Sequence, residues 1–235
     1  MVLYKDGKVC LKVVYWGMAG SGKTTILQTL YKLTKTTKKD IVPIGNLQII
    51  ARESGATLYF DRGLFQSTKQ KKVYYRVFTV AGQTSFSPLR IKLFNKPEDK
   101  TDAVIFVADS QTKYLEDNIE SLRELKSIVD DKLIKEIPFI VMLNKQDLEE
   151  VIDKDVFIQI LKNEKLWYSL ENRLNRWNPI IYETCALYDQ QKEIYRSFHE
   201  CARRTALYQI YGDGKAPGFS IDEDFPDDFP DDLNI

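Results

Sequence analysis

The sequence predicts an α/β fold with a mostly parallel six-stranded sheet, one antiparallel strand and helices on both faces. Short apolar segments alternate along the chain with segments of helical spacing, the pattern of strands joined by helices. A glycine-rich turn joins the first apolar segment to the first helical one. The 235 residues are 43% hydrophobic and 29% charged, which is ordinary for one globular domain and excludes wholesale disorder.

The first half of the chain predicts a strand, a turn, a helix and then a hairpin. Residues 9–16 are apolar and β-branched, and the helical spacing of residues 25–33 follows the glycines. After a polar stretch, residues 57–60 and 73–80 flank a polar segment suited to a hairpin turn. This hairpin would supply the antiparallel strand.

Beyond the hairpin, strands and helices alternate. Continuous apolar runs are typical of parallel strands that are buried on both faces. The expected strands span residues 103–108, 138–143 and 179–184, and the expected helices span about 114–129, 153–162 and 190–207. Residues 162–177, rich in charged and aromatic side chains, are interpreted as a second helical piece before the last strand.

Charge divides the chain into one domain over residues 1–211 and an acidic tail over 212–235 that is expected to be disordered. Residues 213–235 contain eight acids and one base, which gives −7, and the neutral total leaves +7 on the rest. Because that basic excess is spread over many segments, nucleic-acid binding is disfavoured. No apolar run approaches the roughly 18 residues of a membrane span and no signal core is visible, so we expect a cytoplasmic protein without an integral membrane segment.

Residues 17–24 read Gly-Met-Ala-Gly-Ser-Gly-Lys-Thr, the G-x-x-x-x-G-K-[ST] pattern of a phosphate-binding loop, in the required place between strand and helix. Glycines let successive amides point at phosphate oxygens, and the helix N-terminus adds a favourable dipole. Lys23 can neutralise charge on the β- and γ-phosphates, and the Thr24 hydroxyl can ligate Mg²⁺. The residues expected around the phosphates are Ala19, Gly20, Ser21, Gly22, Lys23, Thr24 and Thr25.

The base is predicted from Asn144-Lys145-Gln146-Asp147, which directly follows a buried strand. The Asp147 carboxylate can accept both donors on one edge of guanine, and adenine would leave this acceptor unsatisfied. Asn144 would brace the loop and the other edge of the base, and the Lys145 stem would cover the ring face. At the end of the last strand, the Ala186 amide could donate to the guanine carbonyl oxygen, with Cys185 as a small packing residue beside it.

Residues for hydrolysis are predicted between these motifs. In Thr79-Val-Ala-Gly-Gln83, the Gly82 amide could approach a γ-phosphate and Gln83 could orient an attacking water. Upstream, Thr57 is the candidate to reach both Mg²⁺ and the γ-phosphate. We therefore expect Gln83, Lys23 and Thr57 to act in catalysis, and Thr24 and Thr57 to bind the metal.

With these five sites in order, the chain resembles the Ras-like small GTPases from Val9 to about Leu207, and most closely the MglA group of gliding-motility and polarity GTPases. The segments that support this likeness are 14–17, 56–61, 78–83 and 107–110. The Thr184-Cys-Ala segment also resembles Arf-type proteins. The resemblance implies a P-loop NTPase with a Ras-like G domain, whose two mobile segments order around GTP and relax after hydrolysis. It also implies a Roadblock/LC7-type (MglB-like) regulatory partner and effectors.

The chain departs from this pattern at two positions. Most Ras-like proteins have Asp where this chain has Thr79, an Asp that supports the Mg²⁺ shell, and MglA-like proteins also lack it. Metal binding would then be either weaker or assisted elsewhere, with Asp61 as the candidate. MglA-like proteins commonly carry an Arg at the position of Ala56 that serves as a transition-state cation, and Arg52 is the nearby alternative.

Two functions from different classes therefore stand. The first is a GTP/GDP switch that hydrolyses GTP slowly without a partner, which Gln83 favours. The second is a non-catalytic GTP-binding structural or scaffold subunit, which Ala56 favours. A nucleotide kinase is disfavoured because the 144–147 loop indicates guanine and no Arg-rich lid is visible.

Overall fold

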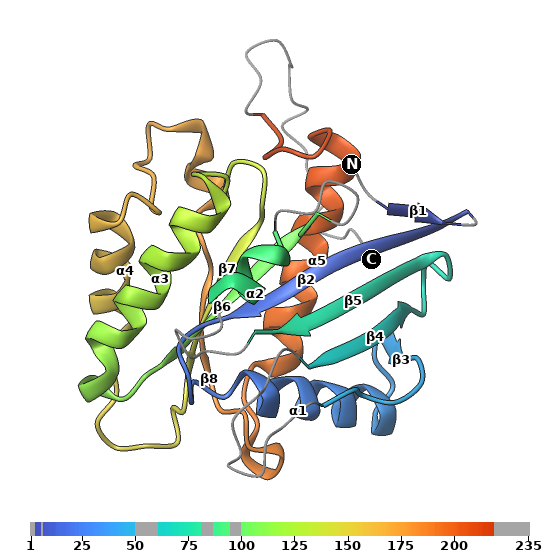
Figure 1. Cartoon of the computed structure of the whole chain (residues 1–235), viewed down its shortest axis with the longest axis horizontal. Helices are drawn as coiled ribbons and strands as arrows, with labels where there is room; N and C mark the ends of the chain where they lie inside the picture. The colour runs from blue at the N-terminus through green and yellow to red at the C-terminus, as the bar shows by residue number, and fades with distance from the viewer. Residues whose placement is uncertain (1–2, 6, 50–60, 81–86, 95–99, 219–235) are drawn as a thin grey trace.

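A central β-sheet organises the computed structural model, which describes residues 3–5, 7–49, 61–80, 87–94 and 100–218 (Figure 1). The main strand order is β3-β4-β5-β2-β6-β7-β8, and β1 pairs with β2 outside this path. The strands are β1 (Leu3–Lys5), β2 (Lys8–Trp16), β3 (Ile41–Pro43), β4 (Arg62–Ser67), β5 (Val73–Thr79), β6 (Ala103–Asp109), β7 (Phe139–Asn144) and β8 (Ile181–Thr184). Strands β5, β2, β6, β7 and β8 are parallel to one another.

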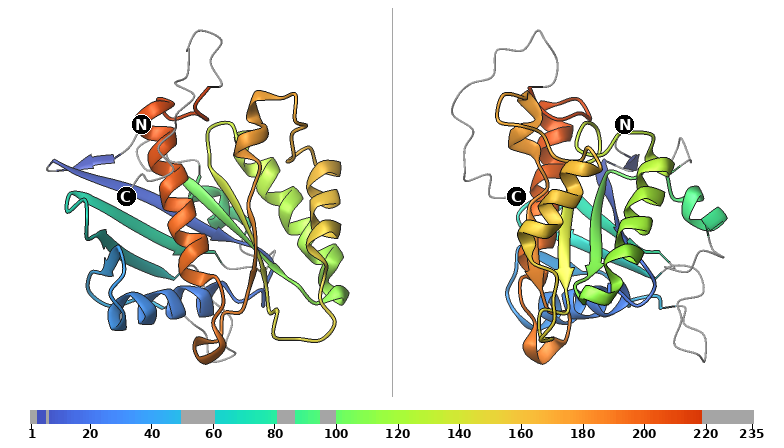
Figure 2. Two further views of the ribbon diagram at one scale, coloured as in Figure 1. Left: turned by 180° about the vertical axis from the view of Figure 1, so that it is seen from behind. Right: turned by 90° about the vertical axis from the view of Figure 1, so that its left-hand side faces the viewer.

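Helices cover both faces of the sheet. The α-helices are α1 (Lys23–Thr36), α2 (Ser87–Lys92), α3 (Leu115–Val129), α4 (Lys154–Asn163) and α5 (Ile194–Tyr211), and the 3-10 helices are η3 (Thr112–Tyr114), η4 (Arg173–Trp177) and η5 (Tyr188–Gln190). Helices α1 and α5 cover one face, and α3 and α4 cover the other (Figure 2). None of the helices within the described part of the chain is both long and apolar enough to cross a bilayer.

The mostly parallel α/β fold is confirmed, with one strand placed differently from the expectation. The expected strand at 57–60 lies outside the described residues, and the strand that pairs antiparallel with β5 is β4, at Arg62–Ser67. Along β4, Gly63, Phe65 and Ser67 are buried while the residues between them are partly exposed. Because two of the three buried positions are Gly and Ser, this half-buried strand has no apolar periodicity to detect.

Within the described residues the sheet has eight strands, two more than the six expected. Both β1 and β3 are three residues long and antiparallel to their neighbours, β2 and β4, which is too short for a periodic signal. Strand β3 ends at Pro43 and forms one edge of the main path. Proline lacks an N–H and is tolerated on an edge strand, where it also discourages pairing with another chain.

The expected helical piece over 162–177 is mostly wrong. Helix α4 ends at Asn163, and only Arg173–Trp177 forms a short 3-10 helix. The Asn178 side chain binds the loop backbone instead, since its Oδ1 accepts from the Tyr168 N–H at 2.8 Å and its Nδ2 donates to the Tyr168 carbonyl at 2.9 Å. Side-chain hydrogen bonds of this kind compete with helix formation.

The packed part of the chain continues past the boundary expected at residue 211. The Ala216 N–H donates to the Lys135 carbonyl at 2.7 Å, and the Trp177 indole donates to the Pro217 carbonyl at 3.0 Å. Ala216 is only 1% exposed. Residues 212–218 therefore belong to the folded body, and the rest of the expected tail, 219–235, lies outside the described residues.

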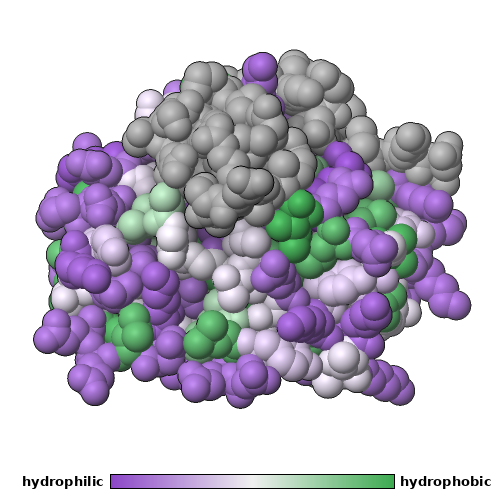
Figure 3. Space-filling model, turned by 60° about the horizontal axis from the view of Figure 1, so that its bottom comes forward, coloured by the Kyte–Doolittle hydropathy of each residue, from purple (hydrophilic) through white to green (hydrophobic). Residues whose placement is uncertain are grey.

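Burial of the central strands positions the residues that follow them. Every residue of β6 and β7 is buried, because helices cover both sides of these strands. On the face shown in Figure 3, hydrophilic side chains predominate and the apolar ones stand in separate small groups. The carboxyl ends of the parallel strands meet at one edge of the sheet, and all the predicted nucleotide motifs that the structure describes lie there.

Candidate nucleotide-binding site

The phosphate loop closes tightly against two neighbouring strands. Gly17 has φ +152°, and a Cβ there would lie 2.1 Å from the Val107 carbonyl oxygen of β6. Gly22 has φ +97°, and its Cβ would lie 2.3 Å from Asn144 Nδ2 at the end of β7. Besides the loop conformation, Gly17 is thus required by the close β6 backbone and Gly22 by the close Asn144 side chain.

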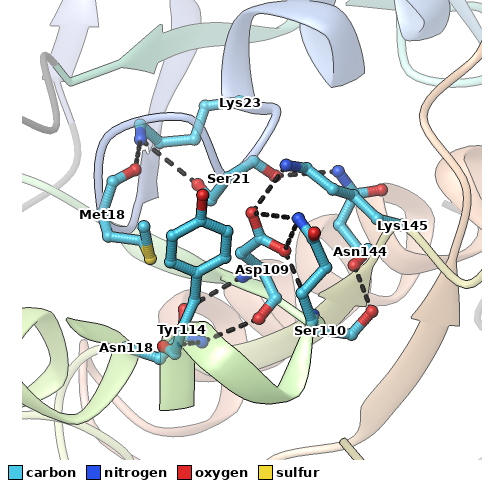
Figure 4. Close-up of polar contacts among 10 residues, drawn as sticks. Met18, Ser21, Lys23, Asp109, Ser110, Tyr114, Asn118, Asn144 and Lys145 are labelled. Atoms are coloured by element: carbon cyan, nitrogen blue, oxygen red, sulfur yellow. Dashed lines mark hydrogen bonds and ion pairs between the residues drawn. The ribbon is translucent and has the colours of Figure 1, made fainter. Parts of the chain in front are cut away.

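Lys23 begins α1 and reaches back over the loop. Its Nζ donates to the Gly17 carbonyl at 2.8 Å. It also donates to the Met18 carbonyl at 2.6 Å and to Ser21 Oγ at 3.3 Å (Figure 4). Burial lowers the pKa of the Lys23 ammonium to about 7, Arg90 acts in the same direction, and Asp61 opposes both. A phosphate in the loop would supply the negative charge that favours the charged form.

The remaining predicted phosphate residues flank Lys23 along the loop and the first turn of α1. Ala19 and Gly20 are exposed at the tip of the loop, Ser21 is buried, and Thr25 is half-buried in the first turn of α1. The N-cap of α1 is Gly22, and the first turn contains no acidic residue. The positive end of the helix dipole is therefore uncompensated by a nearby carboxylate on α1, which suits an anionic ligand.

Three elements bring polar oxygens together beside the start of α1. Asp61 Oδ2 accepts from Thr24 Oγ1 at 2.5 Å and from Thr79 Oγ1 at 2.9 Å. The Asp61 N–H donates to Thr79 Oγ1 at 3.2 Å, and both Asp61 and Thr79 are fully buried. A carboxylate thus stands next to the predicted metal-binding hydroxyl, and this set of hard oxygen donors fits Mg²⁺.

Asn144 links the phosphate loop to the predicted base loops. Its Nδ2 donates to the Ser21 carbonyl at 2.8 Å, and its Oδ1 accepts from Thr184 Oγ1 at 3.3 Å. The Asn144 carbonyl accepts from both the N–H and the hydroxyl of Ser110, at 2.9 and 2.5 Å. Asn144 is only 1% exposed, and its side chain bridges the phosphate loop and the end of β8.

The two predicted base-reading segments meet at the same edge. The Gln146 N–H donates to the Thr184 carbonyl at 3.1 Å, and the Ala186 carbonyl accepts from Thr29 Oγ1 of α1 at 2.6 Å. Asp147 is exposed. Burial raises the pKa of the Cys185 thiol, and a hydrogen bond with the Asp147 carboxylate also raises it. Asp147 therefore lies beside Cys185.

Several predicted site residues cannot be placed. Thr57, Gly82 and Gln83 lie outside the described residues, and so do Arg52 and Ala56. Their roles in catalysis and metal binding stay predictions.

Two polar contacts near the site were missed by the sequence reasoning. Lys145 Nζ forms an ion pair with Asp109 Oδ2 at 2.6 Å, and Asp109 is 1% exposed. On α2, Arg90 pairs with Glu124 of α3 at 2.6 Å, and its guanidinium carbon lies 5.1 Å from the centre of the Trp16 ring. The sequence does contain a signal for Asp109, because it is an acidic residue at the end of an otherwise apolar strand. The short helix α2, which carries Arg90, has no recognisable sequence signal.

Phe94, just after α2, also packs on Trp16, with ring centroids 5.8 Å apart in an edge-to-face arrangement. The Trp16 indole donates to the Ser121 carbonyl of α3 at 2.9 Å. The Lys12 ammonium and Thr101 Oγ1 both donate to the Leu93 carbonyl, at 2.7 and 3.0 Å. The carboxyl end of α2 is thereby attached to the strand that leads into the phosphate loop.

Comparison with known proteins places these features in a family. The model of the ADP-ribosylation factor family matches residues 3–199. The chain is 31% identical over 170 residues to the mutual gliding-motility protein MglA of Myxococcus xanthus, covering 69% of this chain and 81% of that protein. It is 28% identical over 152 residues to ADP-ribosylation factor-like protein 3 of Chlamydomonas reinhardtii, covering 64% and 70%.

The fold is also found among solved structures. The small GTPase Arl6 (BBS3) of Trypanosoma brucei, determined with the bound nucleotide analogue GppNp, superposes with a TM-score of 0.56 at 22% identity. The match covers 84% of this chain and 98% of that one, which supports the Ras-like G-domain fold. The chain therefore belongs to the ADP-ribosylation factor family of small GTPases.

Proposed function

We propose that this protein is a GTP/GDP switch that binds guanine nucleotide with Mg²⁺ and hydrolyses GTP slowly unless a partner assists. The observation that supports it most is the role of Asn144. Its side chain joins the Ser21 carbonyl of the phosphate loop to Thr184 in front of the second base loop. One side chain thus sets the spacing between the phosphate-binding and base-binding parts.

Guanine selectivity would come from Asp147. Its carboxylate would accept the ring N1–H and the exocyclic amino group, while the Ala186 amide would donate to the carbonyl oxygen. Adenine would leave the carboxylate unsatisfied, at a cost of about 1 to 3 kcal/mol or more for a charged group. The adjacency of Asp147 and Cys185 supports this assignment, since the two base loops must approach the same ring.

The metal would be held by Thr24, with Asp61 in support and Thr57 as the second predicted protein ligand. The Thr24 hydroxyl donates a hydrogen bond to Asp61, so the hydroxyl oxygen and the carboxylate stand side by side where a cation would bind. Asp61 would supply the negative charge that Thr79 lacks. The ion, when bound, would neutralise charge on the β- and γ-phosphates.

Hydrolysis would depend on Lys23, on the Gly82 amide and on Gln83 as the residue that orients water. Ala56 offers no cation for the charge that develops in the transition state, a contribution of about 10³ to 10⁵ in rate in related enzymes. A Roadblock/LC7-type (MglB-like) protein is the proposed activating partner, supported by the similarity to MglA.

Single-turnover hydrolysis of bound GTP, with and without such a partner, tests the proposal. We expect slow conversion to GDP by the protein alone and faster conversion with the partner. Tight GTP binding with no turnover in either reaction would favour the second candidate, a non-catalytic scaffold subunit, which Ala56 supports. Equal affinity for ATP and GTP would contradict guanine recognition.

A further inference from the structure

Asp109 ends β6, the strand beside β7 in the middle of the sheet. The register pairs Asp109 with Asn144, the first residue of the base loop. Its side chain is almost completely buried, and a buried carboxylate is unfavourable unless it is paired and hydrogen-bonded. The partners of this carboxylate therefore show what it stabilises.

The backbone of Asp109 is held independently of its carboxylate. The Asp109 N–H donates to Asn118 Oδ1 at 2.9 Å, and Asn118 Nδ2 donates to the Asp109 carbonyl at 2.8 Å. The same Nδ2 donates to the Tyr114 carbonyl at 2.8 Å, and Asn118 is fully buried in α3 (Figure 4). The strand end is thus attached to α3 without using the acid.

The carboxylate itself points toward the base loop. Lys145 Nζ lies 2.6 Å from Oδ2, and Gln111 donates to Oδ1 through its backbone N–H at 3.1 Å and its Nε2 at 3.0 Å. A charge-assisted contact this short is among the stronger polar interactions. Gln111 orients the carboxylate, so that Lys145 meets an acceptor of fixed direction.

Lys145 needs such an anchor. Its φ of +74° lies in the left-handed region, which side chains other than Gly, Asn and Asp seldom adopt. The side chain is 30% exposed, and an unanchored lysine would sample many rotamers in water. The contact of the ammonium with Asp109 restricts the side-chain rotamers of Lys145, so that its methylene stem runs from the loop to the end of β6.

We propose that Asp109 is a positioning residue for guanine-nucleotide binding, which holds Lys145 so that its stem forms one wall of the base pocket. This inference rests on the proposed function. It assigns a task to a buried acid that would act through Lys145, and it makes the affinity for the base depend on a residue of β6.

A double-mutant cycle tests the proposal with Asp109→Asn, Lys145→Gln and the double variant. Affinities for GDP and for inorganic tripolyphosphate are measured by displacement of a fluorescent GDP. We expect each single variant to bind GDP about 10- to 100-fold more weakly, and the double variant to be no worse than the weaker single one. Tripolyphosphate affinity is expected to stay within about twofold, because the phosphate loop is unchanged. Asp117→Asn, at an exposed acid on α3, is the matched control.

Each other outcome refutes the proposal. Unchanged GDP affinity in Asp109→Asn would remove the role of Asp109, and equal losses for GDP and tripolyphosphate would show general structural damage. If the Asp109→Asn variant does not fold, the double variant, which buries no charge, is compared with Lys145→Gln instead. A GDP affinity tenfold lower in the double variant than in Lys145→Gln would overturn the proposed coupling. If the parent protein does not bind GDP, the proposed function is refuted as well. If the parent binds GDP and the Asp109→Asn variant binds it equally well, only the role of Asp109 is refuted.

Discussion

The replacement Asp61→Asn tests the proposed Mg²⁺ site, in which Thr79 stands in place of an acid. The carboxylate is fully buried and accepts two hydroxyl hydrogens, from Thr24 at 2.5 Å and Thr79 at 2.9 Å. The amide keeps the shape and one acceptor oxygen but removes the charge. Hydrogen bonds to charged groups contribute about 1.5 to 3 kcal/mol, so loss of the charge beside the metal should weaken Mg²⁺ about 10- to 100-fold.

The assay is dissociation of fluorescent GDP over a Mg²⁺ titration. We expect the Asp61→Asn variant to need about 10- to 100-fold more Mg²⁺ to slow GDP dissociation to the same extent. At saturating Mg²⁺, its GDP dissociation rate should approach that of the parent protein. Thr79→Asp in the Asp61→Asn background should restore much of the Mg²⁺ dependence, since it returns a carboxylate to the same oxygen cluster. Glu116→Gln, an exposed acid on α3, serves as the control. A half-saturating Mg²⁺ concentration within twofold of the parent in Asp61→Asn would refute the reasoning.

Three further predictions concern the base, the reaction and the carboxyl-terminal segment. Asp147→Asn should weaken GTP by about 2 to 4 kcal/mol and shift preference toward XTP, whose carbonyl accepts a hydrogen bond; competition binding with GTP, ATP and XTP measures this, and an unchanged GTP/XTP ratio contradicts it. Gln83→Leu should abolish the slow hydrolysis while Arg52→Ala leaves it unchanged, measured in single turnover; loss in both variants would instead identify Arg52 as the missing cation. Deletion of the residues after Gly218 should leave the thermal unfolding midpoint within about 1 °C of the parent. Deletion from Gly212 onward also removes the packed Ala216 and should lower the free energy of unfolding by about 1 to 2 kcal/mol. Equal unfolding midpoints of the two deletion variants in calorimetry would contradict this.

The sequence predicted the fold and the nucleotide motifs because both depend on local pattern. Apolar runs over β6 and β7 and the glycines of the phosphate loop are signals that a single segment contains. What it could not predict depends on contacts between distant segments. Strand β4 is defined by its pairing with β5, and the packing of Ala216 depends on a carbonyl 81 residues earlier, at Lys135.

The same distinction holds within the site. Gly17 and Gly22 were predicted because the loop backbone must bind phosphate. In the structure, the ends of the neighbouring strands also leave no room for a larger residue at either position. The sequence drew attention to Asp109 only as part of segment 107–110, which resembles the MglA group. Its contact with Lys145 was not predicted, because Lys145 is 36 residues away at the end of another strand. Sequence patterns locate such residues at strand ends but do not pair them.

The position of Trp16 gives this protein a built-in optical probe. The indole stands at the entry to the phosphate loop, with the Arg90 charge over its ring and Phe94 against its edge. Indole emission responds to nearby charge, so any movement of α2 that carries Arg90 away will change the fluorescence of Trp16. The other two tryptophans, Trp167 and Trp177, lie between α4 and β8, and Trp177 packs on Tyr208 of α5. The emission of these two tryptophans adds to the Trp16 signal in the unlabelled protein.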